Sequence, residues 1–488
     1  MEDESDFYSA CDINYNTDVV SDDEYFMPAD AGVSLSPRCS DGGKKDEVTK
    51  RRVGPLPFLF KEGCSTKKRT TIFLATQTIT RQNIFLNGLF QNILFLYDML
   101  TMMGYDCYLL YGDDDVISAE KDIRIIGSNV KKYCGGSGGS GGDGGDGGDG
   151  GDVCDKYTAY FSHFKYIFLD DYIKSGVGGC ERMKVDLYIE IGMTIDNEFR
   201  MMLVRQNNNV KIVKLYLGNT LNIDVEHSCV GLKNNSTFCT HALGLIHQVW
   251  TSPHYKNNAE YLGVINGLPP SKKYSKIVPY IWDSTLFMKG LVADTKKERE
   301  KSSDPLLTDI IIVEPNISFQ KSALIPFQMA SEFYKKYPQW KGKVRIYNAW
   351  NIIHNSFWNE VLVKSELHKE GRVELYSNRM AVCDIIVEAG NAVFITNQVT
   401  NDLNYIILEL MTAGIPVVHN SNMWKEFGYA YSDIDFKNSI GVLHNAVFYH
   451  ELNSRAYMEH AHELVNSVDI YNEEVRAKWK TVIDGILQ

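Results

Sequence analysis

Several motifs that mark well-known enzyme classes are missing from this chain of 488 residues. Outside the Gly-rich tract at 135–152 it has no GxGxxG fingerprint of dinucleotide binding, no P-loop, no GxSxG nucleophile elbow and no HExxH zinc motif. Its ten cysteines include no CxxC pair, and the histidines between His227 and His254 lack ligand-like spacing, so zinc is not expected. The function therefore has to be inferred from weaker patterns.

Long apolar runs and a surplus of basic residues are also missing. The most apolar run, Ile93–Met103, is short and interrupted by Asp98, so no membrane span is expected. Met1 is followed by EDESD rather than by a signal peptide, and scattered cysteines are typical of reduced, intracellular proteins. The formal charge of −12 argues against a nucleic-acid partner, although local basic groups can still bind a small anion. We expect a soluble, cytoplasmic protein.

Composition and length predict a globular protein with more than one domain. Hydrophobic residues make up 44% and aromatic residues 12% of the chain, and 488 residues exceed what one core usually organises. The acidic start and the tract GGSGGSGGDGGDGGDGGD have little to bury and are typical of a disordered tail and a flexible insertion. The predicted division is a tail at 1–66, a first domain at 67–290 with the insertion at 135–152, a charged linker at 291–305 and a second domain at 306–488.

Short apolar segments alternate with helical patterns along both predicted domains, which favours parallel sheets covered on both faces. Two successive Rossmann-like halves should bind their ligand at the carboxyl ends of the strands. The predicted strands of the first half are Thr71–Ala75, Tyr105–Tyr111, Tyr166–Leu169, Val185–Ile191, Val210–Leu217, Gln248–Trp250 and Lys276–Val278, with a helix at Leu86–Met103. Those of the second half are Asp309–Val313, Val344–Asn348, Val373–Tyr376, Val393–Thr396 and Pro416–His419, with helices at Ala323–Tyr334, Ser356–Leu367 and Asn453–Ile486.

The segment Asn401–Asn420, NDLNYIILELMTAGIPVVHN, carries the clearest functional pattern. A polar loop precedes an apolar helix, and backbone N–H groups near Asn404 at such a helix start suit a phosphate. The helix contains one acid, Glu409, which needs a partner or water in these apolar surroundings. We expect Glu409 to accept hydrogen bonds from the hydroxyl groups of a ribose or a sugar.

Other polar residues follow predicted strands and should reach the same cleft. Lys321 lies near a helix start, and both it and Arg379 are candidates to neutralise a diphosphate, with solvated surface cations as the alternative. Glu314 and Asn316 are further candidates on the donor side. Candidates on the side of the first half, where turn and capping roles are the alternative, are Asn83, Asn87, Gly88, Glu190, Asn219, Asp224 and His227. The run Asp113–Asp115 is interpreted as an exposed acidic turn rather than a metal site.

Residues about 70–435 resemble a domain family of glycosyltransferase-like proteins with the two-domain GT-B fold. The segments that carry the resemblance share their order along the chain. They are NxxFxNGLFQN (Asn83–Asn92), YIEIGMTID (Tyr188–Asp196), YLGNTLNIDVE (Tyr216–Glu226), VWTSPHY (Val249–Tyr255), VPYIWDS (Val278–Ser284), VEPNISFQKSALIP (Val313–Pro326) and NDLNYIILELMTAGIPVVHNS (Asn401–Ser421).

The resemblance implies an enzyme that uses a nucleotide-sugar donor, here a UDP- or GDP-sugar, and normally needs no metal ion or other cofactor. In the wider GT-B group the donor helix carries two glutamates eight positions apart. Glu409 matches the second, but the first position holds Asn401. The retaining mechanism of that group is therefore not carried over to this chain.

The leading hypothesis is a glycosyltransferase that moves a sugar to a glycan or protein acceptor. One of Glu190, Asp224 and His227 would be the base that activates the acceptor hydroxyl in an inverting reaction. The alternatives are a non-catalytic virion or scaffold protein that kept the fold, and a nucleotide-sugar epimerase. An Asn- and Tyr-rich composition would suit a large DNA virus or a protist, in which case host cytoplasm or virion is the expected location.

Overall fold

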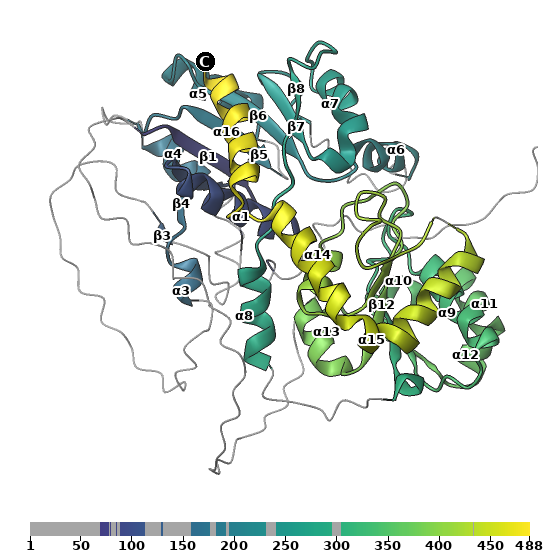
Figure 1. Cartoon of the computed structure of the whole chain (residues 1–488). Helices are drawn as coiled ribbons and strands as arrows, with labels where there is room; N and C mark the ends of the chain where they lie inside the picture. Colours follow the sequence, from purple (N-terminus) through teal and green to yellow (C-terminus); the bar gives the residue numbers. More distant parts are fainter. Residues whose placement is uncertain are drawn as a thin grey trace, which may run out of the picture.

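Two parallel β-sheets with helices on their faces form the structure, a computed structural model (Figure 1). The structure describes residues 69–77, 79, 84, 88–112, 128–129, 158–175, 182–191, 195–230, 241–294, 304–432 and 434–488. Outside these residues lie the predicted tail at 1–66, the insertion at 135–152, Asp113–Asp115, Asn83 and Asn87.

The first sheet has eight strands among the described residues, and each neighbouring pair is parallel. In spatial order the strands are β3 (Ser128–Asn129), β4 (Lys165–Phe168), β2 (Asp106–Tyr111), β1 (Thr71–Thr76), β5 (Leu187–Ile191), β6 (Lys211–Tyr216), β7 (Gln248–Thr251) and β8 (Ser275–Ile277). The associated helices are α1 (Gly88–Met102), α3 (Thr158–Phe161), α4 (Leu169–Lys174), α5 (Asn197–Gln206), α6 (Thr220–Val230), η3 (Pro253–Asn258), α7 (Ala259–Ile265) and α8 (Ser284–Asp294).

The second sheet has six strands in the described part of the chain, again all parallel. Their spatial order is β11 (Val373–Leu375), β10 (Val344–Ile346), β9 (Asp309–Ile312), β12 (Ala392–Ile395), β13 (Val417–His419) and β14 (Tyr429–Ala430). The helices in this part of the chain are η4 (Pro305–Leu307), α9 (Leu324–Lys336), α10 (Trp350–Ile353), α11 (Ser356–Lys364), α12 (Glu366–Lys369), α13 (Val382–Ala389), α14 (Tyr405–Thr412), α15 (Phe436–Val468) and α16 (Glu473–Leu487). The predicted α/β fold with two Rossmann-like halves is confirmed.

Successive side chains of each strand enter different cores, which explains why the strands are apolar without alternation. In β1, Phe73 belongs to the apolar cluster that includes residues of α5 and α7, whereas Leu74 belongs to the cluster that contains α1. That second cluster continues into the other half of the chain, where it includes Ile311 of β9 and Phe394 of β12. The two halves therefore share one continuous apolar core.

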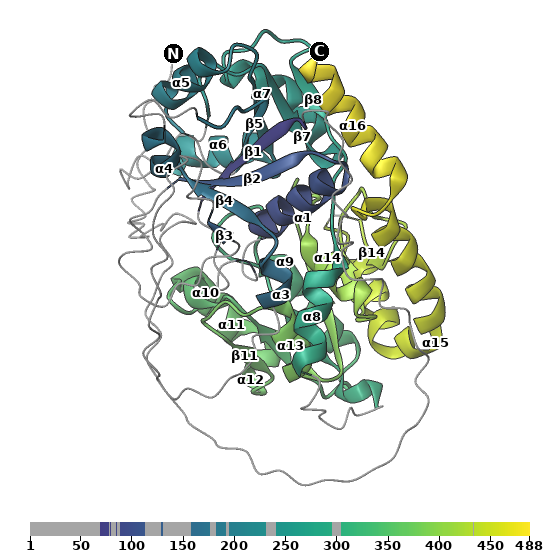
Figure 2. The ribbon, with the colours of Figure 1, turned by 90° about the vertical axis from the view of Figure 1, so that its left-hand side faces the viewer.

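Two helices pack across the predicted division of the chain. Helix α8, predicted mainly within the first domain, packs against α13 and α14 of the second. Helix α16, predicted within the second domain, lies along the first sheet (Figures 1 and 2), where Trp479 Nε1 donates to the carbonyl of Pro279 at 3.0 Å and its ring meets that of Trp250. Buried side chains spaced along one face of α16, Val475, Trp479 and Ile483, explain this docking. The predicted domain limits remain predictions.

Candidate functional site

Glu314 follows β9 at the carboxyl end of the second sheet. Its carboxylate accepts hydrogen bonds from the hydroxyl of Thr396, the N–H of Asn397 (2.9 Å) and the side-chain amide of Gln398 (2.8 Å). Burial raises the pKa of Glu314 to about 7, although these bonds and the charge of Lys321 oppose the rise. The predicted donor-side acid thus joins the loops after β9 and β12.

The loop after β9 is held by Asn316, another predicted donor-side residue. Its side-chain amide donates to the carbonyl of Asn348 at 3.2 Å, and its Oδ1 accepts from the N–H of Ala323 at 2.8 Å. Asn316 and Asn348 both adopt positive φ, 59° and 56°, a conformation that stores strain in residues other than glycine. The N–H of Asn316 donates to the carbonyl of Lys321 at 3.1 Å, which closes the loop on itself.

The second predicted phosphate-binding cation lies farther along the same edge. Arg379 is exposed in the segment that follows β11, and β10 separates β11 from β9 in the sheet. Because the strands are parallel, Lys321 and Arg379 follow carboxyl ends on the same edge of the sheet, as the sequence predicted.

The start of α14 is capped by two sets of protein groups. Asn404 is the N-cap, and its Oδ1 accepts from the N–H of Ile406 at 3.3 Å. The hydroxyl of Tyr255, from the first half, donates to Oδ1 of Asn401 and accepts from the N–H of Leu403 at 3.3 Å. Part of the predicted phosphate cradle is therefore engaged by the first half of the chain.

Glu409 lies on the face of α14 that meets α1. Its exposed fraction is 7%, and burial raises its pKa to about 7, with a side-chain hydrogen bond from Gln91 as the opposing influence. One turn earlier on α14, Tyr405 packs so closely on the first residue of α1 that a Cβ on Gly88 would lie 2.1 Å from the Tyr405 ring. Glu409, the predicted sugar-binding acid, is thus held at the contact between the two halves.

His254 is a residue of this contact that the sequence did not single out as a site. It lies in η3 after β7, and its ring meets Tyr280 and, across the contact, Trp424, at centroid distances of 5.5 and 5.1 Å. Among the described residues neither buried ring nitrogen has a hydrogen-bond partner, and burial lowers the pKa of His254 to about 4. Such unpaired buried groups call for an explanation. Its position directly after a predicted strand was the available signal.

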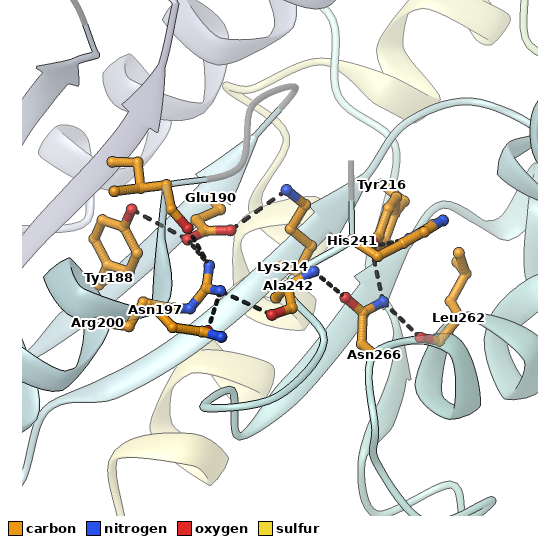
Figure 3. Close-up of polar contacts among 11 residues, drawn as sticks. Tyr188, Glu190, Asn197, Arg200, Lys214, Tyr216, His241, Ala242, Leu262 and Asn266 are labelled. Carbon is orange, nitrogen blue, oxygen red and sulfur yellow. Dashed lines mark hydrogen bonds and ion pairs between the residues drawn. The ribbon is translucent and has the colours of Figure 1, made fainter. Parts of the chain in front are cut away.

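Glu190, a predicted base, lies inside the first half within a network of buried charges (Figure 3). Its exposed fraction is zero, and its carboxylate is 2.8 Å from Nη1 of Arg200 and 3.4 Å from Nζ of Lys214. The hydroxyl of Tyr188 donates a further bond at 3.3 Å. These contacts assign Glu190 a structural role, since the carboxylate balances two buried cations.

Two other predicted bases, Asp224 and His227, lie on α6. Asp224 Oδ2 accepts a hydrogen bond from the hydroxyl of Tyr261 at 2.7 Å and lies 2.9 Å from Nε2 of His241. The other ring nitrogen of His241, Nδ1, is 2.9 Å from the hydroxyl of Tyr216 (Figure 3). Asp224 is therefore turned toward α7, within the first half. His227 is exposed in the last turn of the helix. The identity of the base stays a prediction.

The opposite face of α6 meets the second half. Asn219 donates to the carbonyl of Thr400, and Asn222 donates to the hydroxyl of the same residue, which has φ of 53°. One turn later, Glu226 Oε2 accepts from the hydroxyl of Ser318 at 2.7 Å. Because residues four apart share a helix face, Asn222 and Glu226 point to the second half while Asp224 points away.

In the part of the chain that the structure describes, no group of three or more His, Cys, Asp or Glu residues could hold a metal ion. None of the described helices combines the length and apolarity needed to cross a membrane.

A family model described as "Protein of unknown function (DUF2827)" matches residues 179–483, more than half of the chain. The chain belongs to this family. The match covers β5 to β8 of the first sheet and all strands of the second, and it includes Glu190, α6, His254 and the whole of α14. No curated protein matches the chain.

Solved structures with this architecture include trehalose-phosphate enzymes of low identity. The alpha,alpha-trehalose-6-phosphate synthase from Burkholderia multivorans has a TM-score of 0.50 and 10% identity, with 86% of this chain and 98% of that chain covered. The trehalose-6-phosphate synthase OtsA has the same TM-score and identity and covers 86% and 99% of the two chains. The N-terminal domain of trehalose-6-phosphate phosphatase from Candida albicans also has a TM-score of 0.50 and 10% identity, with 86% of this chain and 99% of that chain covered. The likeness confirms the predicted GT-B-like fold of this DUF2827 protein.

Proposed function

We propose that the protein is a glycosyltransferase that binds a nucleoside diphosphate sugar where its two halves meet and transfers the sugar to an acceptor hydroxyl. The observation that carries the proposal is the position of Glu409, a buried carboxyl on α14 at the contact between two parallel sheets. Ligands of such folds bind beyond the carboxyl ends of the strands. The GT-B-like fold supports the same reaction class.

Each donor group has a candidate partner in this proposal. Lys321 and Arg379 would neutralise the diphosphate, and N–H groups near Asn404 would add to them. Glu409 would accept from ribose or sugar hydroxyls. His254, with two unpaired ring nitrogens and a low pKa, is neutral near pH 7 and would exchange hydrogen bonds with the sugar. This preorganised charge would stabilise the departing diphosphate without a metal ion.

The test is binding of UDP-glucose and GDP-mannose, as probes of the two donor classes, by isothermal titration calorimetry. We expect Lys321→Ala and Glu409→Ala each to weaken donor binding at least tenfold, because each removes a contact to the ligand. Lys335→Ala is the matched control, since Lys335 is an exposed lysine of α9 paired with Glu332. Binding that survives both site changes would contradict the site, and absence of binding across a donor panel would contradict the function.

A non-catalytic protein on the same fold is the second candidate, favoured by one specific contact. The hydroxyl of Tyr255 engages both Asn401 and the N–H of Leu403, at the position where the donor helix begins. A binding or scaffold protein would keep this contact permanently. Donor hydrolysis or transfer detected by release of the nucleoside diphosphate would exclude this candidate.

A further inference from the structure

A carboxylate of the first half occupies the loop after β9. Glu226 Oε2 accepts from the hydroxyl of Ser318 at 2.7 Å, and Glu226 Oε1 accepts from the N–H of Phe319 at 3.4 Å. The Ser318 oxygen in turn accepts from the N–H of Gln320 at 3.2 Å. A hydroxyl and a backbone amide that converge on two oxygens of one anion form an anion-binding arrangement.

Positive charge reinforces this arrangement. Lys321 follows directly in the same loop, and its charge acts on the buried carboxyl of Glu314 at the end of β9. The backbone of Lys321 bridges Ser318 on one side and Gln398 on the other, which fixes the loop next to the segment that leads to α14. The groups that meet Glu226 therefore lie in the loop that also carries Lys321, one of the two cations proposed to neutralise the donor diphosphate.

Glu226 reaches this loop only because the two halves are in contact. It shares a face of α6 with Asn222, which donates to Thr400 in the loop before α14. A diphosphate and a carboxylate cannot use the same donors at once, since like charges at this distance repel. The contact between the halves and anion binding are thus mutually exclusive at Ser318 and Phe319.

We propose that Glu226 is an intramolecular competitor of the donor diphosphate. In the ligand-free protein its carboxylate fills the anion-binding loop Ser318–Lys321, and donor binding displaces it. The identity of the displacing ligand rests on the proposed function. The displacement is a regulatory property of that same site, because the affinity for donor is reduced by the stability of the Glu226 contact.

The first test measures UDP and GDP binding to Glu226→Gln by isothermal titration calorimetry. Loss of the competing charge should tighten binding about tenfold, equivalent to ~1.4 kcal/mol. Glu260→Gln is the matched control, since Glu260 is an exposed acid on α7. Equal affinity of the wild-type protein and Glu226→Gln would overturn the proposal while leaving the proposed function intact.

The second test needs no nucleotide. Amide hydrogen exchange of the ligand-free proteins should be faster across the loop Ser318–Lys321 in Glu226→Gln than in the wild-type protein and Glu260→Gln, because the charge-assisted bond to the N–H of Phe319 is weakened. If no nucleotide binds to any variant, the proposed function fails, and this measurement still decides whether the Glu226 carboxylate occupies the loop. Unchanged exchange would overturn that occupancy.

Discussion

Glu190 in the first sheet and Glu409 on α14 are both almost inaccessible to solvent, but their surroundings differ. Glu190 lies between Arg200 and Lys214, so its ionised form is balanced by two cations. Glu409 has one amide partner, Gln91, and burial raises its pKa to about 7. The first carboxylate is held by two cations, whereas the pKa of the second places its change of protonation near neutral pH.

Two histidines show the same contrast. His241, inside the first half, lies within hydrogen-bond distance of Tyr216 and Asp224, one at each ring nitrogen. His254, at the contact between the halves, has neither nitrogen paired among the described residues. Both ring nitrogens of His241 have partners within the first half, whereas the proposed function predicts that a ligand supplies partners for His254 at the contact between the halves.

The largest expected effect comes from breaking the interior network. Glu190→Gln leaves Arg200 and Lys214 without their counter-charge, and we expect the free energy of unfolding to fall by about 3–5 kcal/mol. Urea unfolding measures this loss. Glu198→Gln, at an exposed acid of α5, should change stability by less than about 0.5 kcal/mol. If Glu190→Gln lowered the free energy of unfolding by less than about 1 kcal/mol, the pairing of Glu190 with two cations would not distinguish it from Glu409.

A smaller effect of opposite sign is expected for Glu409→Gln. The unfolded chain ionises this group above pH 4.5, but the folded protein does so only above about 7, so stability is lost as the pH rises between these values. Above pH 7 the loss is complete and amounts to about 3 kcal/mol. Glu409→Gln should therefore be more stable than the wild-type protein at pH 8 by up to that amount, with little difference at pH 4.5.

Urea unfolding at both pH values checks this prediction, with Glu451→Gln on the exposed surface of α15 as the control. A difference between the wild-type protein and Glu409→Gln that does not change with pH would show that Glu409 is already paired in its ionised form.

The smallest effects are expected at the two histidines, where they differ in sign. His241→Phe leaves Tyr216 and Asp224 without their shared partner and should destabilise the protein by about 1–3 kcal/mol. His254→Phe removes an unpaired polar ring from aromatic surroundings and should leave stability unchanged or raised by about 1 kcal/mol. Thermal unfolding compares the variants. Donor binding should fall in His254→Phe, and equal destabilisation of both variants would contradict the distinction.

The strands were predictable from the sequence because both faces of each sheet are covered. Unbroken apolar runs such as TIFLA and DIIIV therefore mark the strands directly, and β1 and β9 lie within one residue of the predicted ends. The ends of helices were harder to predict from the sequence. The predicted helix Asn453–Ile486 is two helices, α15 and α16, and α15 begins at Phe436 with Asp435 as its N-cap. The break before α16 follows from the side chain of Asn472, which caps the second helix.

The sequence by itself determined the order of strands and helices along the chain, because the periodicity of buried side chains is local information. It also determined that polar residues follow the strands of the second sheet, including Glu314, Lys321 and Asn404. Which polar residues are paired was decided only by the tertiary structure, since Arg200 and Lys214 reach Glu190 through packing between separate elements. The same holds for Glu226, which meets Ser318 across 92 residues of sequence. Such contacts depend on the arrangement of whole helices, which no local pattern encodes.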